Sequence, residues 1–415
     1  MGSVFLVVLV DLLGFGIILP LLPFFASQFS AGPVAIGFLY AAYSLAQLVF
    51  SPLWGSLSDR IGRRPVMILS TLGSSASYLV FVFSHSFGAL FLSRLLAGIM
   101  GGNIAAAQSY ISDVTPPEGR AKGMGLLGAA FGIGFAIGPA IASILLHPRF
   151  FGLLQTLGLA SAAAWAQKNP YAGPGLVACF LSFTSFLLVL TRLPESLKRS
   201  EGPPSSERLS VLSPAFWKEI ARENASSPAH LLPLLLGCVF LFSFAQSSLY
   251  SSFPLFCQSV LKLSPSRIGM QFAFMGMIAI LIQGGLIRLL VKAFGETRLL
   301  WVGSVLMTAG FATVPLARSV GWLTGALALM AVGGSLNGPT LFSLVSQEAP
   351  AGRTGTTMGL SQSSAGLGRV VGPLWGGALY GMGAGLPFWA TSAVLVLAFP
   401  AARIIARHKA AAAGS

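Results

Sequence analysis

The sequence predicts an all-α membrane protein with twelve transmembrane helices in two parallel six-helix repeats. Three observations predict this fold class. Only 9% of the 415 residues are charged and the mean hydropathy is +0.80, whereas roughly a quarter of a soluble domain is charged. Apolar stretches of about twenty residues, long enough to cross a hydrocarbon core of about 30 Å as helices, recur along the chain. Many residues also repeat at one constant offset.

The spans must be helices, because lipid offers no hydrogen-bond partners to the backbone of an open strand. The first span lacks the basic start, short apolar core and small-residue site of a cleavable signal. Residues 2–3 and 410–415 are expected to be remnants of cloning outside the fold. The expected spans cover residues 3–28, 34–57, 65–84, 87–112, 122–146, 173–192, 231–258, 267–290, 298–317, 321–346, 354–382 and 386–403.

The 25 Lys and Arg residues predict the orientation. Basic residues concentrate in cytoplasmic loops. Eighteen lie on the side of the N-terminus, five lie on the other side, and Arg94 and Arg369 lie within spans. We therefore expect a multi-pass protein with both termini in the cytoplasm, in a plasma or an organelle membrane. The net charge of +14 then reflects topology and not nucleic-acid binding.

An internal repeat is the strongest architectural signal. Spans four and five recur as spans ten and eleven, in the same orientation because six spans separate them. Parallel six-span repeats place a solute site at their interface near the bilayer midplane. At an offset of 234 residues, Asn103 matches Asn337, Ser112 matches Ser346, Pro116 matches Pro350, Met124-Gly125-Leu126 matches Met358-Gly359-Leu360, and Gly132, Gly134, Gly138 and Pro139 match Gly366, Gly368, Gly372 and Pro373.

A polar stretch divides the chain into two bundles. Residues 194–229 are rich in Pro, Ser, Glu and Arg and too polar to bury a core. We expect a six-helix bundle over 1–193, a cytoplasmic linker over 194–229 and a second six-helix bundle over 230–409. The linker segment 215–224 is either a short amphipathic surface helix or solvated chain. The outer loop 147–172 contains a semi-apolar stretch of unassigned role.

The loop after span two reads GSLSDRIGRRPV. Gly55 is expected to permit close helix approach, and Gly62 a tight turn. The charged side chains can form a cluster that holds one state of a moving protein and separates in the other. Alternatively, the arginines only enforce topology. The expected gating residues in this loop are Gly55, Asp59, Arg60, Gly62, Arg63 and Arg64.

This loop resembles the loop between spans two and three of the major facilitator superfamily. The resemblance narrows to the twelve-span drug:proton antiporters, because Val10–Pro23 looks like the first span of the tetracycline/proton antiporters. The segment from Arg94 to Gly101 is similar to the family motif whose buried arginine serves proton coupling. Asp113 would, by resemblance, pair with the loop arginines. The resemblance implies the major facilitator fold.

Span five carries a second motif of that family. Gly134, Gly138 and Pro139 resemble its Gly-Pro antiport motif, and they join the expected gating set with their repeat copies Gly372 and Pro373. Ala142-Ser143 stands where the family usually has two glycines, which weakens the antiport inference. Packing alone also explains glycines in spans, because small residues let helices approach in lipid.

Ionisable groups inside a membrane are expensive and usually functional. Asp11, Arg94 and Arg369 form this set. Asp11 and Arg94 are the expected proton-coupling residues. Arg369, replaced by Phe135 in the first half, is expected to bind the solute. A purely structural salt bridge is the alternative.

Polar and aromatic residues in the spans suit a site for amphipathic organic molecules. Each one alone could instead join helices by hydrogen bonds. Besides Arg369, the expected solute-binding residues are Tyr43, Gln47, Asn103, Gln246, Tyr250, Asn337 and Gln362.

These observations predict a secondary transporter that couples protons to the export of a small amphipathic organic solute by alternating access. The alternatives are an organic-anion carrier or facilitator not driven by protons, and a non-transporting membrane receptor. We expect no enzyme, because neither a nucleophile motif nor a metal-ligand cluster is present in the sequence. The expected partners are the solute, protons and the bilayer, with no cofactor, no metal and a monomeric chain.

Overall fold

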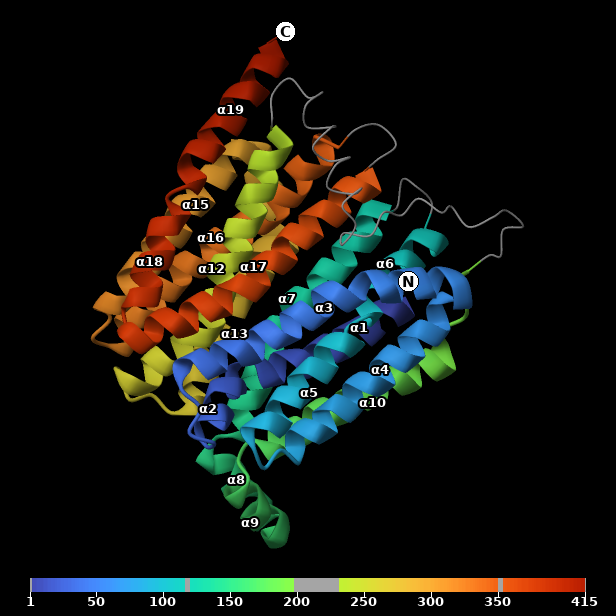
Figure 1. Ribbon diagram of the computed structural model, residues 1–415, viewed down its shortest axis with the longest axis vertical. Coiled ribbons are helices and arrows are strands. Elements are labelled where there is room, and N and C mark those ends of the chain that lie inside the picture. The colour runs from blue at the N-terminus through green and yellow to red at the C-terminus, as the bar shows by residue number, and fades with distance from the viewer. Residues whose placement is uncertain (1, 116–119, 198–230, 350–353, 415) are drawn as a thin grey trace.

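The computed structural model describes residues 2–115, 120–197, 231–349 and 354–414, and these residues contain helices and no strands (Figure 1). The expected linker segment 215–224 lies outside the described residues. The first half comprises α1 (Gly2–Ile18), η1 (Leu19–Leu21), α2 (Leu22–Ser27), α3 (Pro33–Ile61), α4 (Arg63–Val82), α5 (Phe87–Met100), α6 (Asn103–Val114), α7 (Arg120–Leu145), α8 (Pro148–Thr156), α9 (Ala160–Lys168) and α10 (Ala172–Arg192).

The second half begins after residue 230. One of its segments, η3, is a single π-helical turn that interrupts the eighth span. The half comprises α12 (Leu231–Ser259), α13 (Pro265–Leu281), η3 (Ile282–Leu286), α14 (Ile287–Phe294), α15 (Glu296–Thr313), η4 (Val314–Leu316), α16 (Val320–Gln347), α17 (Thr354–Met382), α18 (Leu386–Leu395) and α19 (Ala398–Gly414).

Ten of the described helical segments are long and apolar enough to cross a membrane, and α7 with α8 forms a bent eleventh candidate. The remaining expected span, α17, is 29 residues long and rich in Gly and Ser. Every expected span is therefore helical where the structure describes it. The first consists of α1, η1 and α2, and the fourth is interrupted between α5 and α6 at Gly101 and Gly102. Helix α19 continues over residues 410–414, which we expected to lie outside the fold.

The helices of each half pack mainly on one another, and two helix pairs make most of the contacts between the halves: α3 with α17 and α7 with α13. Three hydrophobic clusters form the core. Two lie in the first half and one in the second. At one end the clusters interlock, because Phe24 of α2 belongs to the cluster of the second half and Leu255 of α12 to a cluster of the first.

The two ends of the bundle differ. We call the end with Asp59, Arg63, Asp113 and Glu195 the charged end, and the other, which carries α2 and α8, the opposite end. Figure 1 shows α3 and α17 side by side near the opposite end and diverging toward the charged end. The halves therefore meet at the opposite end and separate at the charged end.

Backbone contact closes the opposite end. A Cβ added to Gly37 of α3 would collide with the carbonyl of Pro373 in α17, and one on Gly377 would collide with the carbonyl of Pro33. Only glycine permits this approach at these two crossings. The halves are consequently in direct main-chain contact here.

Two buried serines form a second link between the halves, where α7 meets α13. The hydroxyl of Ser143 in α7 donates to the Ser266 carbonyl at 2.6 Å, and the hydroxyl of Ser266 at the start of α13 donates to the Ser143 carbonyl at 2.8 Å. Both side chains are at most 5% exposed. Ser143 is one of the two residues that depart from the family glycines, so this chain has a polar link at that position.

The segment 147–172 forms two short helices, α8 and α9, that pack on each other. Figure 1 shows this pair projecting from the opposite end, away from the bundle. No residue of α8 is buried. The pair therefore does not cap the crossing of α3 and α17.

We predict that the double variant Ser143→Ala, Ser266→Ala opens the opposite end more readily. Each hydrogen bond contributes about 1 kcal/mol, so losing both should shift the open-to-closed ratio about thirtyfold. Double electron–electron resonance between spin labels at Arg149 and Lys262 measures this shift. Ser84→Ala, whose hydroxyl donates to the Val80 carbonyl within the same half, is the matched control. An unchanged distance distribution in the double variant would show that the serines do not hold this end closed.

Candidate functional site

A set of ionisable and phenolic side chains from both halves gathers in the interior, and we call it the central cluster. Six helices contribute: α1, α3, α4 and α5 from the first half, and α12 and α17 from the second. The members are connected by hydrogen bonds or by electrostatic interactions between their side chains. They are Asp11, Tyr40, Tyr43, Tyr78, Arg94, Tyr250 and Arg369.

Asp11 lies in α1 at the edge of this cluster. Its carboxylate accepts a hydrogen bond of 2.8 Å from the hydroxyl of Ser182 in α10. The phenols of Tyr43 and Tyr78 are close enough to interact electrostatically with it. A charged carboxylate in this interior is thus partly stabilised by neutral dipoles.

Arg94 of α5 is 2% exposed, and aromatic rings surround its guanidinium. The guanidinium carbon lies 5.7 Å from the ring centre of Tyr78 and 5.1 Å from that of Phe81, within the range of cation–π attraction. Its Nε donates to the Ser93 hydroxyl at 3.3 Å, and its Nη2 has no hydrogen-bond partner among the described residues. Among the described residues, Arg94 is therefore a buried cation that contacts aromatic rings and has no carboxylate partner.

Arg369 of α17 interacts electrostatically with Tyr43 of the first half and Tyr250 of the second. Each phenol is oriented by a glutamine one helical turn away. The Gln47 amide donates to the Tyr43 hydroxyl at 3.3 Å, and the Gln246 amide donates to the Tyr250 hydroxyl at 3.1 Å. No ion pair joins Arg369 to a carboxylate within the described part of the chain. The guanidinium is thus flanked by two matched Tyr–Gln pairs.

Aromatic rings form an apolar wall beside these phenols. Phe135 of α7 stacks on Tyr250 at 6.2 Å between ring centres, with an interplanar angle of 3°, and so crosses from one half to the other. The ring centre of Phe15 lies 5.0 Å from that of Tyr43 and 5.8 Å from that of Phe135. Phe135 is the repeat equivalent of Arg369, so one half supplies a ring and the other a cation. Flat apolar faces beside hydrogen-bonding groups suit an amphipathic organic molecule.

Three other residues were expected at the solute site, and none of them is shown in contact with the central cluster. The side chain of Asn103 is not described. Its repeat copy, Asn337 of α16, is 1% exposed and packs against Gly303 of α15. The structure therefore does not bring Asn337 to Arg369. Gln362 is exposed on α17 and lies two helical turns before Arg369, on the same face.

Glycines fix the helices that carry the cluster. Gly134 and Gly138 of α7 leave no room for a Cβ against Leu12 and Gly16 of α1, the helix of Asp11. Gly372 does the same for α17 against the backbone of α12, next to the helix turn of Arg369. These glycines have a packing role in this structure.

The prolines of the same motif lie at contacts between the halves. A Cβ on Gly269 of α13 would come within 3.0 Å of the Pro139 carbonyl. The carbonyl of Pro373 accepts a hydrogen bond of 3.2 Å from the Ser251 hydroxyl and lies against Gly37. Each motif therefore holds a helix within its half and contacts the other half.

The charged end contains a second cluster. Arg63, 6% exposed, forms an ion pair with Asp59, another of 2.9 Å with Asp113, and donates to the Ser58 hydroxyl at 3.0 Å. The hydroxyl of Ser196 donates to Asp113 at 3.0 Å. The expected pairing of Asp113 with a loop arginine is present. All these groups belong to the first half, so the cluster joins α3, α4, α6 and the segment after α10.

Glu195 completes this cluster, although it lies within the expected linker, which begins at residue 194. Its carboxylate accepts from the backbone N–H groups of Arg63 and Arg64 at 2.9 and 3.0 Å, which are free donors at the start of α4. Partial burial raises the pKa of Glu195, but the backbone donors outweigh it and hold the pKa below its usual value. Residues 194–197 therefore pack with the first half.

The remaining loop residues differ in their surroundings. Gly62 adopts φ +109°, and a Cβ there would also collide with the Glu195 carboxylate, so the expected tight turn is confirmed. A Cβ on Gly55 would meet open space, so the expected close helix approach at Gly55 is wrong. Arg64 donates to the Leu190 carbonyl at 2.8 Å, and Arg60 is exposed.

The second half has its own polar cluster at the charged end. Glu296 accepts from the Ser343 hydroxyl at 2.5 Å and from the Gln347 amide at 2.8 Å, and Lys409 pairs with Glu348 at 2.8 Å. Gly295, at φ +75°, makes the turn before Glu296 as Gly62 does before Arg63. The turn is thus repeated although the charges differ.

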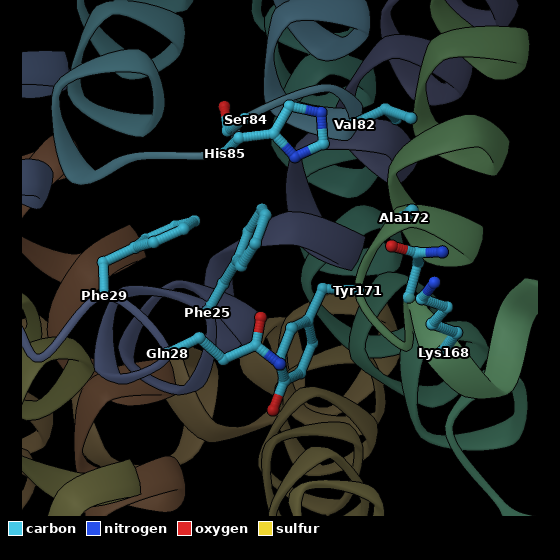
Figure 2. A pocket seen from close by; sticks show the side chains of 10 residues that line it. Phe25, Gln28, Phe29, Val82, Ser84, His85, Lys168, Tyr171 and Ala172 are labelled. Carbon is cyan, nitrogen blue, oxygen red and sulfur yellow. The ribbon is translucent and has the colours of Figure 1, made fainter.

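A small cavity of about 170 Å³ lies at the opposite end (Figure 2). Figure 2 shows His85 above Phe25 and Tyr171, with Gln28 and Lys168 at its sides. This cavity lies between α2 and the start of α10, and it contains no member of the central cluster.

The fold and these clusters agree with a comparison against known families. The family model described as Major Facilitator Superfamily matches residues 4–373, and the chain belongs to this superfamily. It is accordingly a multi-pass membrane transporter for a small solute and not an enzyme, because its relatives are transporters. The expected fold class is confirmed.

Several characterised proteins are similar over most of their length. The tetracycline resistance protein, class B, of Escherichia coli is 28% identical over 391 residues, which cover 92% of this chain and 88% of that protein. Major facilitator superfamily domain-containing protein 10 of Homo sapiens is 29% identical over 435 residues, covering 95% and 90%.

Two solved structures share the fold. The crystal structure of the human organic anion transporter MFSD10 (TETRAN) has a TM-score of 0.69 and 25% identity, covering 97% of this chain and 98% of that one. A bacterial homolog of the human lysosomal transporter Spinster has a TM-score of 0.75 at 17% identity, covering 98% and 96%. The second likeness concerns the fold alone.

We predict that Glu195→Gln lowers thermal stability in a pH-dependent way. Because the folded pKa of Glu195 lies below its ordinary value, its charged form stabilises the fold above the unfolded pKa of about 4.3, and this contribution is lost as pH falls through the folded pKa. Scanning fluorimetry of the purified protein should show a lower melting temperature for the variant at pH 7 and equal values at the acidic limit. A difference independent of pH would contradict this role.

Proposed function

We propose that this chain is a secondary active transporter that exchanges protons for a small amphipathic organic solute by alternating access. The charged end faces the cytoplasm in this proposal, because most Lys and Arg residues lie on that side of the spans. Export then moves the solute from the charged end to the opposite end. One chain contains the whole central cluster, so a monomer is sufficient.

One observation carries the proposal. A single intramembrane carboxylate, Asp11, shares the central cluster with two guanidinium groups that have no ion pair with a carboxylate in the described chain. Structural cations in lipid are normally paired, as Arg63 is here with Asp59 and Asp113. Buried cations that have no counterion among the described residues are therefore available to a ligand or to a titrating group.

Asp11 is the proposed proton carrier. Its charged form needs hydrogen bonds or a nearby cation to offset the loss of hydration. Ser182 supplies one hydrogen bond in this conformation. If Arg94 approaches Asp11 in the alternate conformation, the carboxylate releases its proton there, and it regains a proton when the guanidinium withdraws. That cycle is what coupling to a proton gradient requires.

Arg369 is the proposed anchor for the solute. Its planar guanidinium can donate two parallel hydrogen bonds to an acidic group, while Tyr43 and Tyr250 contribute one donor from each half. Phe15 and Phe135 offer flat apolar surface beside them. A solute held this way contacts both halves, so its binding can favour one relative position of the halves over another.

The arrangement of the halves fits one step of the cycle. Main-chain contacts and the Ser143–Ser266 link close the opposite end, while the halves diverge at the charged end (Figure 1). In the proposed orientation, this arrangement is assigned to the state of the cycle that faces the cytoplasm. The Arg63 cluster then keeps the first half rigid as it moves, and Arg60, exposed beside it, is the residue free to contact the other half.

A second candidate is an organic-anion carrier not driven by protons. The observation that favours it is the excess of two guanidinium groups over one carboxylate in the central cluster. The human relative MFSD10 is described as an organic anion transporter. The two candidates differ in whether accumulation requires a pH gradient.

We predict that Asp11→Asn abolishes accumulation driven by a pH gradient while downhill exchange continues, because an amide cannot carry the proton. The measurement uses proteoliposomes with an imposed pH gradient and a panel of amphipathic anions and cations as solutes. Glu348→Gln, which neutralises a carboxylate outside the central cluster, is the control and should accumulate solute normally. Gradient-driven accumulation in Asp11→Asn would exclude Asp11 as the sole carrier, and accumulation indifferent to the gradient in the unmodified protein would favour the second candidate.

A further inference from the structure

The second half contains a large apolar groove that no step of transport uses. It has a volume of about 660 Å³ and lies between α14, α15, α16 and α19. Figure 1 shows two of these helices, α15 and α19, on the side of the second half that faces away from the first. Among the lining side chains are Leu290, Phe294, Trp301, Val302 and Leu306. None belongs to the central cluster.

Two arginines give the groove a charged rim. Arg298 of α15 and Arg403 of α19 are the charged residues among its lining, and both are exposed. Neither makes an ion pair or a hydrogen bond with a described residue. Two acidic residues at the charged end of this half have other partners: Glu296 accepts from Ser343 and Gln347, and Glu348 pairs with Lys409. The rim is therefore positive and lacks a counterion from the described chain.

The groove has the depth of one lipid leaflet. Arg298 stands at the charged end of α15, and Leu306 lies eight residues further along the same helix. At 1.5 Å per residue this distance is about 12 Å, compared with about 15 Å for half of a hydrocarbon core. Cations at the level of the headgroups and an apolar trough beneath them match a phospholipid in polarity along its length.

The local backbone leaves this flank open. The π-helical turn η3 lies between α13 and α14, and its first residue, Ile282, lines the groove. Gly284 and Gly285 in the same turn have no side-chain neighbour. π-helical turns are uncommon and often mark functional positions. Phe294 and Trp301 remain 54% and 39% exposed, which leaves apolar surface for an acyl chain to cover.

We propose that this groove binds an anionic phospholipid from the leaflet at the charged end. Arg298 and Arg403 hold the headgroup phosphate, and the trough between α14, α15 and α19 holds an acyl chain. Basic pockets between membrane helices recognise anionic headgroups by this chemistry. A second copy of the chain would have to present an acidic apolar surface, and the proposed solute site has its own cation, Arg369. The positive charge of the rim therefore favours an anionic lipid over a second copy of the chain or the transported solute.

The test is native mass spectrometry of the purified full chain in detergent, titrated with phosphatidylglycerol or with phosphatidylcholine of the same acyl chains. We expect phosphatidylglycerol to bind more tightly. Each arginine near an anionic lipid contributes about fivefold, so the double variant Arg298→Gln, Arg403→Gln should weaken phosphatidylglycerol binding about twenty-five-fold. Arg407→Gln, an equal charge change on α19 outside the groove, should change it less than about twofold. Ala406→Trp, which fills the trough, should weaken both lipids.

Three results would overturn the proposal. Equal binding of the two lipids would show that the rim does not select charge, and unchanged phosphatidylglycerol binding in the double variant would place the lipid elsewhere. A dimer that dissociates in the double variant, with no lipid bound to the unmodified protein, would assign the groove to a second copy. If the transported solute displaced phosphatidylglycerol, the groove would belong to the solute.

Discussion

Contact between helix backbones at glycine is the constraint on which the rest of the structure depends. In lipid, helices gain little from hydrophobic burial against one another, so close van der Waals packing holds them together. Gly134 and Gly138 seat α7 on α1, and Gly372 seats α17 on α12. These contacts fix the positions of Asp11 on α1 and of Arg369 on α17. A side chain larger than hydrogen at these crossings would move the helices that carry the central cluster.

The chain handles its few charges in two ways. At the charged end Arg63 has two carboxylate partners, and Glu195 satisfies the N–H groups at the start of α4, so these charges stabilise the first half. In the interior, Arg94 and Arg369 have aromatic and phenolic neighbours instead. Paired charges at the surface are inexpensive and unpaired charges in lipid are costly. Arg94 and Arg369 have no carboxylate partner among the described residues, and this arrangement is costly. The proposed function accounts for the cost, because transport uses their positive charge.

The sequence predicted the helices, the repeat and the turn at Gly62, because each depends on local chemistry or on self-similarity within the chain. It also indicated the pairing of Asp113 with a loop arginine, through resemblance. It missed Glu195, Tyr78 and Ser182, because their roles depend on contacts between residues more than a hundred positions apart or on the rotation of a helix about its axis. The rotation of α16 about its axis likewise decides where Asn337 points. This residue repeats Asn103 in the sequence, and in the structure its side chain faces α15. The open space at Gly55 likewise depends on where neighbouring helices end.

The central claim is that solute binds between the halves on Arg369 and the two Tyr–Gln pairs. A structure determined by electron cryomicroscopy, with a solute that the reconstituted protein accumulates, tests this most directly. The account predicts density for the solute in contact with the Arg369 guanidinium and with the phenols of Tyr43 and Tyr250, lying against Phe135. Density within one half only, or in the small cavity beside His85 and Lys168 at the opposite end, would contradict it.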